Sequence, residues 1–229
     1  MMKLNRERYL DNPCPVSAAV DCRENIEWSI SYAFHVTDGD KTLPRVLLVG
    51  DSICNAYRDG VRERLEGKAN VTFWVSSYSV TRPEYMRLLA FMLDADDYAV
   101  IHFNNGLHSL EDDTAEWAAA LEKALLLVRA KRPSAKIVWT TSTPLTDPGK
   151  TAKAAELNAA GADVVARLGG IATDDLFALL DPLDRETFWC DTYHHTPEAR
   201  AMEARQVADC VLSAIGVRFA PRKERGKGD

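Results

Sequence analysis

The sequence predicts an α/β domain in which a central parallel sheet of about five strands is covered by helices on both faces. Short apolar runs alternate with amphipathic segments, and several of these runs end in small polar residues. Strands that alternate with helices form right-handed units, so the sheet they build is parallel. No internal repeat or low-complexity linker divides the 229 residues, which are enough for one domain with a sizeable core.

Five short runs rich in Val, Ile and Leu predict the strands. A continuous apolar run is typical of a strand that is buried on both faces, as in a parallel sheet. The runs cover 45–50, 71–76, 98–103, 136–141 and, in a shorter stretch, 170–173.

Amphipathic segments between and after these runs predict the helices. In the segment 112–132, Trp117, Leu121 and Leu125 recur at helical spacing on one face. Pro83 suits the first position of the helix that it opens, because its fixed φ is already helical. The predicted helices cover 55–65, 83–93, 112–132, 150–168, 174–180 and 197–215.

The domain predicted from these elements spans 45–216. Residues 1–44 lack a strong period and are predicted to form an extension that packs on the domain, with a short helix over 24–34. Residues 217–229 are rich in Lys and Arg and predict a disordered basic tail.

Composition excludes several classes of protein. The net charge of −6 argues against nucleic acid as the main partner, and no apolar run is long enough to span a membrane. The N-terminus has charged residues where a secretion signal would be apolar, so a cytoplasmic location is expected. Five cysteines without a CxxC pair indicate neither a disulfide framework nor a zinc site.

The first candidate for chemistry is Ser52, which follows the strand 45–50 and precedes a helix. At that position its backbone N–H and the positive end of the helix dipole would face an oxyanion. Serine needs a neighbouring base to become a strong nucleophile. The alternative is that Ser52 only caps the helix.

The second candidate is the segment Asp191-Thr192-Tyr193-His194, directly before the last predicted helix. A carboxylate three residues before a histidine can hold the ring through Nδ1, which leaves Nε2 free to act as a base. In the alternative interpretation Asp191 is a helix cap and His194 is solvated. His195 would be the base if the register were shifted by one residue.

Together these two motifs resemble the first and last signature blocks of the SGNH (GDSL-like) hydrolases. The resemblance implies a flavodoxin-like three-layer α/β/α fold, in a superfamily that includes carbohydrate acetylesterases, lipases and thioesterases. It also implies Ser52 as nucleophile, His194 as general base and Asp191 as its orienting carboxylate. This chemistry requires no metal and no cofactor.

The resemblance extends to one esterase-like branch of GDSL-like proteins whose members are mostly uncharacterised. It covers most of the chain from about residue 25 to residue 207. The similar segments are 43–55, 71–81, 100–108, 140–145, 173–179 and 193–198.

One departure concerns the second signature block, whose glycine supplies an N–H to the oxyanion hole in the superfamily. The matching loop here, 76–79, contains no glycine. Because the donor is a main-chain group, Ser79 or Tyr78 can supply it instead. We therefore expect the backbone N–H groups of Ser52 and Ser79 in the hole.

A second departure concerns the third block, in which an asparagine side chain completes the hole. The sequence has Asn104-Asn105-Gly106-Leu107-His108 there, and the register is ambiguous. Asn104 ends the strand and ranks first, Asn105 ranks second, and His108 ranks third.

Four further residues are expected to contact substrate: Tyr78, His108, Trp189 and His195. Trp189 is the one tryptophan outside a clear apolar face, and it would offer a wall for stacking a sugar ring. His102 lies within a predicted strand, so we expect it in the core or behind the site. No histidine spacing suggests a metal site.

The function predicted is that of a serine esterase that hydrolyses a small acyl group, such as acetyl, on a carbohydrate. Its partner would be a small-molecule or carbohydrate ester. One alternative is a thioesterase or lysophospholipase on the same scaffold. The other is a sugar-binding module that keeps the fold without catalysis, an alternative that the glycine-free second block leaves open.

Overall fold

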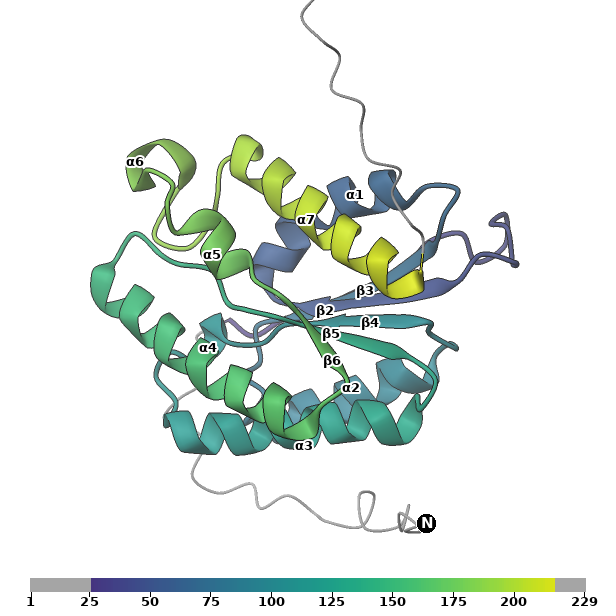
Figure 1. Ribbon diagram of the computed structural model, residues 1–229, viewed down its shortest axis with the longest axis horizontal. Coiled ribbons are helices and arrows are strands. Elements are labelled where there is room, and N and C mark those ends of the chain that lie inside the picture. The colour runs from purple at the N-terminus through teal and green to yellow at the C-terminus, as the bar shows by residue number, and fades with distance from the viewer. Residues whose placement is uncertain (1–25, 217–229) are drawn as a thin grey trace, which may run out of the picture.

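Six strands form one sheet in the computed structural model of the chain, which describes residues 26–216 (Figure 1). All neighbouring strands are parallel except the pair at one edge. The predicted parallel sheet is confirmed, with one strand more than expected. Across the sheet the strands are β1 (Ser29–Ala33), β3 (Asn70–Ser76), β2 (Arg45–Gly50), β4 (Val100–Phe103), β5 (Lys136–Thr140) and β6 (Ile171–Asp174).

The additional strand, β1, corrects the prediction for the segment before residue 45. The sequence predicts a short helix over 24–34, but residues 29–33 are extended and pair antiparallel with β3. The cause is tertiary, because the edge of β3 offers backbone groups to any extended neighbour. Just beyond the strand, Phe34 N–H donates to the Val71 carbonyl at 3.0 Å.

Helices cover both faces of the sheet, as predicted (Figure 1). One face carries two long helices and the other carries three, and each set encloses its own apolar core against the strands. The first face has α1 (Ser52–Leu65) and α7 (Pro197–Ile215); the second has α2 (Pro83–Asp94), α3 (Thr114–Lys131) and α4 (Pro148–Leu168). Shorter helices are η2 (Leu107–Ser109), α5 (Leu176–Leu180) and α6 (Arg185–Phe188).

The central strand β2 contributes to both cores. Val46 and Leu48 belong to the core beneath α1 and α7, whereas Leu47 and Val49 belong to the core on the opposite face. Successive side chains of a strand point to opposite faces, so the uninterrupted apolar run of β2 is buried at every residue after Arg45.

The order of the five parallel strands, β3-β2-β4-β5-β6, is that of flavodoxin-like sheets. The chain leaves β2 toward β3 on one side and returns on the other side of β2 as β4. Ligands in such sheets bind at this reversal, beyond the carboxyl ends of the strands. A ligand-binding site is therefore expected in the loops after β2, β3 and β4.

The predicted basic tail, 217–229, and residues 1–25 of the predicted extension lie outside the described residues. Within residues 26–216, no helix combines the length and the apolar character needed to cross a membrane.

Candidate active site

Ser52 lies at the turn between β2 and α1. The helix begins at Ser52 rather than at residue 55, and its N-cap is Asp51, whose Oδ1 accepts the Ile53 N–H at 2.9 Å. The turn is tight: a Cβ on Gly50 would lie 2.4 Å from the Cβ of Cys54, so glycine is required there. Because Asp51 caps the helix, the Ser52 hydroxyl is available for another partner.

That partner is His194. Its Nε2 lies 2.9 Å from Ser52 Oγ, and its Nδ1 lies 2.8 Å from Asp191 Oδ2. Ser52 and His194 are 142 positions apart in the sequence, so only the fold brings them together. Both distances fall within the hydrogen-bond range expected between a nucleophile, its base and the group that orients the base.

Asp191 also organises the loop from which it comes. Its Oδ1 accepts the backbone N–H groups of Tyr193 at 2.7 Å and His194 at 2.8 Å. Partial burial alone would raise the pKa of Asp191, but these bonds and the His194 ring outweigh it and lower the pKa to about 2. Asp191 therefore stays ionised under ordinary conditions.

The loop that carries Asp191 and His194 is tied at its base and at its tip. Cys190 N–H donates to the His194 carbonyl at 2.7 Å, within a bridge that pairs Trp189 with His195. At the tip, Thr146 N–H donates to the Thr192 carbonyl at 3.1 Å. These main-chain hydrogen bonds fix the backbone position of His194, from which its ring projects.

Two backbone N–H groups named for the oxyanion hole are not used elsewhere. Within residues 26–216, the N–H groups of Ser52 and Ser79 donate no hydrogen bond. Ser52 occupies the first turn of α1, where N–H groups have no partner in the helix and the dipole favours a negative charge. Both groups are thus available to an oxyanion, although Ser79 itself is buried.

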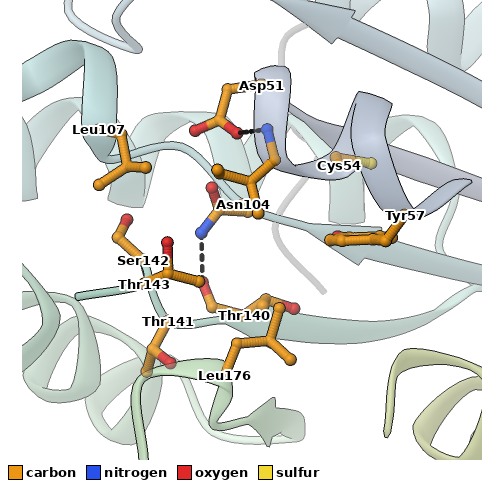
Figure 2. Close-up of a pocket in the computed structure, with 11 residues that line it drawn as sticks. Asp51, Cys54, Tyr57, Asn104, Leu107, Thr140, Thr141, Ser142, Thr143 and Leu176 are labelled. Carbon is orange, nitrogen blue, oxygen red and sulfur yellow. Dashed lines mark hydrogen bonds between the residues drawn. The ribbon is translucent and has the colours of Figure 1, made fainter. Parts of the chain in front are cut away.

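Asn104 and Asn105, the two candidates for the oxyanion hole, each donate one side-chain N–H to a backbone carbonyl. Asn104 Nδ2 donates to the Thr140 carbonyl at 2.8 Å, and Figure 2 shows its nitrogen pointing toward Thr140. Asn105 Nδ2 donates to the Tyr78 carbonyl at 2.9 Å. A carboxamide has two N–H bonds, so each residue has a second N–H besides the one engaged in these bonds.

A narrow pocket lies beside Asp51 and the first turn of α1 (Figure 2). Cys54 lines it, and burial raises the pKa of this thiol to about 12, so Cys54 stays neutral and is a poor nucleophile. The complete lining is Asp51, Ile53, Cys54, Tyr57, Asn104, Leu107, Thr140, Thr141, Ser142, Thr143 and Leu176.

Trp189 and His195, predicted to contact substrate, are in the interior instead. Trp189 is 6% exposed, donates from Nε1 to the Pro144 carbonyl at 3.2 Å, and has the Arg185 guanidinium 4.4 Å from its ring centroid. His195 is 1% exposed, with Nδ1 3.0 Å from Glu203 Oε1. Neither ring has an open face for a sugar, because both pack under the loop rather than on it.

Tyr78 and His108 lie in the loops that follow β3 and β4, as the sequence predicts. Tyr78 is half-buried in the loop after β3. His108 is half-buried on η2, after β4, and meets the Trp28 ring edge-on with centroids 6.3 Å apart. Their contact with substrate stays a prediction.

His102 occupies the core, as expected. Its Nε2 lies 2.8 Å from Asp174 Oδ2 and 2.6 Å from Thr140 Oγ1, and all three residues are buried. Within residues 26–216, no three His, Cys, Asp or Glu side chains gather closely enough to hold a metal ion.

Sequence reasoning did not anticipate two acidic residues that support the loops of the site. Asp112 accepts hydrogen bonds from Ser79 and Thr81, and nothing in its local sequence indicates this. Glu203 does have a signal, because it lies four residues from both Ala199 and Val207 on the buried face of the last helix. A charged residue on that face needs a buried partner.

Comparisons with known proteins agree with this architecture. No protein-family model matches the sequence, and no curated protein matches it. Among solved structures, a carbohydrate esterase family 3 protein from Talaromyces cellulolyticus has a TM-score of 0.63 at 14% identity, covering 77% of this chain and 100% of its own. An acetylxylan esterase from Geobacillus stearothermophilus has a TM-score of 0.59 at 17% identity, covering 77% of this chain and 97% of its own.

A GDSL-like lipase from Bacteroides thetaiotaomicron is also similar, with a TM-score of 0.60 at 12% identity over 78% of this chain and 93% of its own. At such identities the similarity concerns the fold. The chain has the SGNH hydrolase fold, and the resemblance seen in its sequence motifs is confirmed at that level.

Proposed function

We propose that the protein is a serine ester hydrolase. The single observation that carries the proposal is the chain of hydrogen bonds from Ser52 Oγ to His194 Nε2 and from His194 Nδ1 to Asp191. It stands at the carboxyl ends of the parallel strands, on a turn that leaves the Ser52 hydroxyl free of helix capping. A structural role needs none of these arrangements.

In the proposed reaction Ser52 Oγ attacks the carbonyl carbon of the ester while His194 Nε2 takes the hydroxyl proton. His194 then gives this proton to the leaving alcohol, and water releases the acyl group with His194 again as base. Asp191 remains ionised, keeps the ring in the required orientation, and stabilises the imidazolium that forms.

The tetrahedral intermediate carries a negative oxygen that needs donors. We assign the backbone N–H groups of Ser52 and Ser79, with the remaining amide N–H of Asn104 or Asn105. Loss of one such donor typically costs about 2.7–4 kcal/mol of transition-state stabilisation.

The substrate we propose is a small acyl ester, with acetyl on a carbohydrate as the leading example. The similar structures include proteins described as an acetylxylan esterase and a carbohydrate esterase. A long acyl chain would need exposed apolar side chains near Ser52. The exposed large apolar residues among those described are Ile26, Tyr32, Val36, Phe91 and Leu126, none of which lies on the loops that carry Ser52 or His194.

The test compares hydrolysis of p-nitrophenyl acetate and p-nitrophenyl laurate by the parent and by Ser52→Ala. We expect turnover of the acetate ester to exceed that of the laurate, and Ser52→Ala to lower kcat by about 10³-fold or more. The melting curve should not change, because Asp51 rather than Ser52 caps α1.

Preference for the laurate ester would indicate a thioesterase or lysophospholipase instead. A folded parent without turnover of either ester would favour a sugar-binding module. Residual activity of Ser52→Ala within tenfold of the parent would remove Ser52 as nucleophile.

A further inference from the structure

The loop after β3 is held firmly although it has no glycine. Asn105 Oδ1 accepts the Val80 N–H at 2.9 Å, and its Nδ2 donates to the Tyr78 carbonyl at 2.9 Å. One buried side chain therefore makes hydrogen bonds to main-chain groups on both sides of Ser79. No residue of this loop has a positive φ, so its conformation does not depend on glycine.

These bonds cross the end of β2. In the sheet β2 lies between β3 and β4, so a residue that follows β4 reaches the loop after β3 only by passing the carboxyl end of β2. That end carries Asp51 and Ser52. The two loops thus meet beside the proposed nucleophile.

Asp112 holds the same loop from another direction. Its Oδ2 accepts the Ser79 hydroxyl at 2.5 Å and the Thr81 hydroxyl at 3.1 Å. Asp112 is fixed in turn by its own N–H, which donates to the Ser109 carbonyl at 3.0 Å. Hydrogen bonds to an ionised carboxylate are about twice as strong as those between neutral groups.

As a result, nearly every polar group of Ser79 is engaged. Its hydroxyl donates to Asp112 and accepts from the Ser109 hydroxyl at 2.8 Å and the Thr81 N–H at 3.1 Å. Its carbonyl accepts the Arg82 N–H at 3.0 Å. Within residues 26–216, the backbone N–H of Ser79 is the one polar group of this residue that lacks a partner.

We propose that Asp112 is a positioning residue for ester hydrolysis, which through the Ser79 hydroxyl holds the Ser79 N–H where the oxyanion forms. Asn105 restrains the flanking peptide groups, and Asp112 fixes the side chain of the donor residue itself. In this way a glycine-free loop presents a rigid donor. The inference rests on the proposed function, because it assigns a role within the same site.

The experiment measures kcat and KM for p-nitrophenyl acetate in the full chain with Asp112→Ala, Asp112→Asn and Ser79→Ala. A donor that is loosened rather than lost should cost less than the 10²–10³-fold of complete removal, so we expect kcat to fall about 10–100-fold. KM should stay within about twofold, because the donor acts on the transition state and not on the bound ester.

The double variant Ser79→Ala with Asp112→Ala provides the sharper readout. If Asp112 acts through the Ser79 hydroxyl, both substitutions break one contact, and the double variant should be no slower than the slower single variant. Effects on kcat that multiply would overturn the inference, as would Asp112→Ala with kcat within twofold of an active parent.

Asp113→Ala is the matched control. Asp113 is the next residue, and it caps α3 through hydrogen bonds from the Ala115 and Glu116 N–H groups. This variant should melt at a lower temperature than the parent with kcat unchanged, so general destabilisation can be separated from positioning. An active parent with an unaffected Asp112→Ala would defeat this inference alone, whereas a parent without ester hydrolysis would remove the proposed function and this inference together.

Discussion

His194 and His195 are neighbours, and each has a carboxylate beside its Nδ1, yet the two pairs differ in almost every other respect. The His194 and Asp191 side chains are 38% and 54% exposed, whereas those of His195 and Glu203 are 1% and 0% exposed. Adjacent residues of an extended segment point to opposite sides, so the His194 ring faces Ser52 and the His195 ring faces the core.

The second ring nitrogen shows what this difference means. His194 Nε2 meets Ser52 Oγ, whereas His195 Nε2 is buried without a hydrogen-bond partner among the described residues. The His195 ring stands edge-on to Trp189, with ring centroids 4.9 Å apart. An acidic partner is therefore common to both histidines, whereas only His194 directs its second ring nitrogen at the Ser52 hydroxyl, which supports the proposal that His194 is the base.

The largest effect should come from replacing the exposed ring. We expect His194→Gln to lower kcat for p-nitrophenyl acetate by about 10³-fold or more, because the base proposed to take the Ser52 proton is lost. The free energy of unfolding should change little, since the side chain is partly solvated. Steady-state kinetics and urea unfolding measure the two quantities.

The matched variant is His195→Gln, which should retain activity within about tenfold while it unfolds at lower urea concentration. If His195→Gln were the inactive variant and His194→Gln the active one, the base would be His195, as in the shifted register.

Next in size is the loss of stability expected from Glu203→Ala. Burial raises the pKa of Glu203, although the nearby His195 lowers it, so the carboxyl depends on its partner. The contact is close but not aligned as a hydrogen bond. Removing one member of a buried pair typically costs about 3–5 kcal/mol.

Urea unfolding at neutral pH measures this cost, with Glu203→Gln as the variant that keeps the shape of the side chain and should lose less. A loss below about 1 kcal/mol for Glu203→Ala would mean that α7 and the His195 ring repack without the pair.

A smaller effect is expected on the pH dependence of stability, through the Asp191 carboxylate. The pKa of Asp191 is lowered to about 2 in the folded protein, whereas it is about 3.9 in an unfolded chain. The stabilisation from ionised Asp191 is thus fully present above about pH 5 and is lost as the pH falls toward 2. Asp191→Asn, which lacks this charge, should be less stable than the parent at pH 7, and the difference should shrink between pH 5 and pH 2.

Unfolding curves of both proteins across this range provide the measurement. A difference that stays constant with pH would show that the charge of Asp191 contributes nothing to the stability of the loop.

The smallest effect expected is none at all. Because the roles proposed for Ser52, His194 and Asp191 require no metal ion, dialysis against EDTA should leave kcat unchanged. Activity that disappears in EDTA and returns with zinc or manganese would indicate metal-assisted hydrolysis instead.

The sequence predicted the parallel strands and the proximity of Ser52, Asp191 and His194, because each is marked by local pattern and spacing, and the structure brings these three side chains together. Their catalytic roles stay a proposal. It could not reveal β1, since residues 29–33 have little apolar pattern and are extended only because β3 offers its edge. The predicted helix there was wrong for that reason.

The hydrogen bonds that hold the loops of the candidate site could not be predicted from the sequence for a related reason. The bonds from Asn105 to Tyr78 and Val80 exist only because β3, β2 and β4 lie side by side, which no local motif encodes. The burial of Trp189 and His195 likewise depends on which side of one loop faces α7. The order of the strands in the sheet and the side of a loop that is buried are set by the packing of the whole chain. Local sequence motifs therefore do not reveal the contacts that depend on them.

The antiparallel strand β1 has a consequence for how the chain can be shortened. It covers the outer edge of β3, a strand that is buried along its whole length and rich in aromatic and β-branched residues. A chain cut at residue 45, where the apolar pattern begins, would leave that edge bare. An unpaired apolar edge is a template for pairing with other molecules, so such a fragment should aggregate during expression, whereas one that keeps residues 26–44 should remain monodisperse.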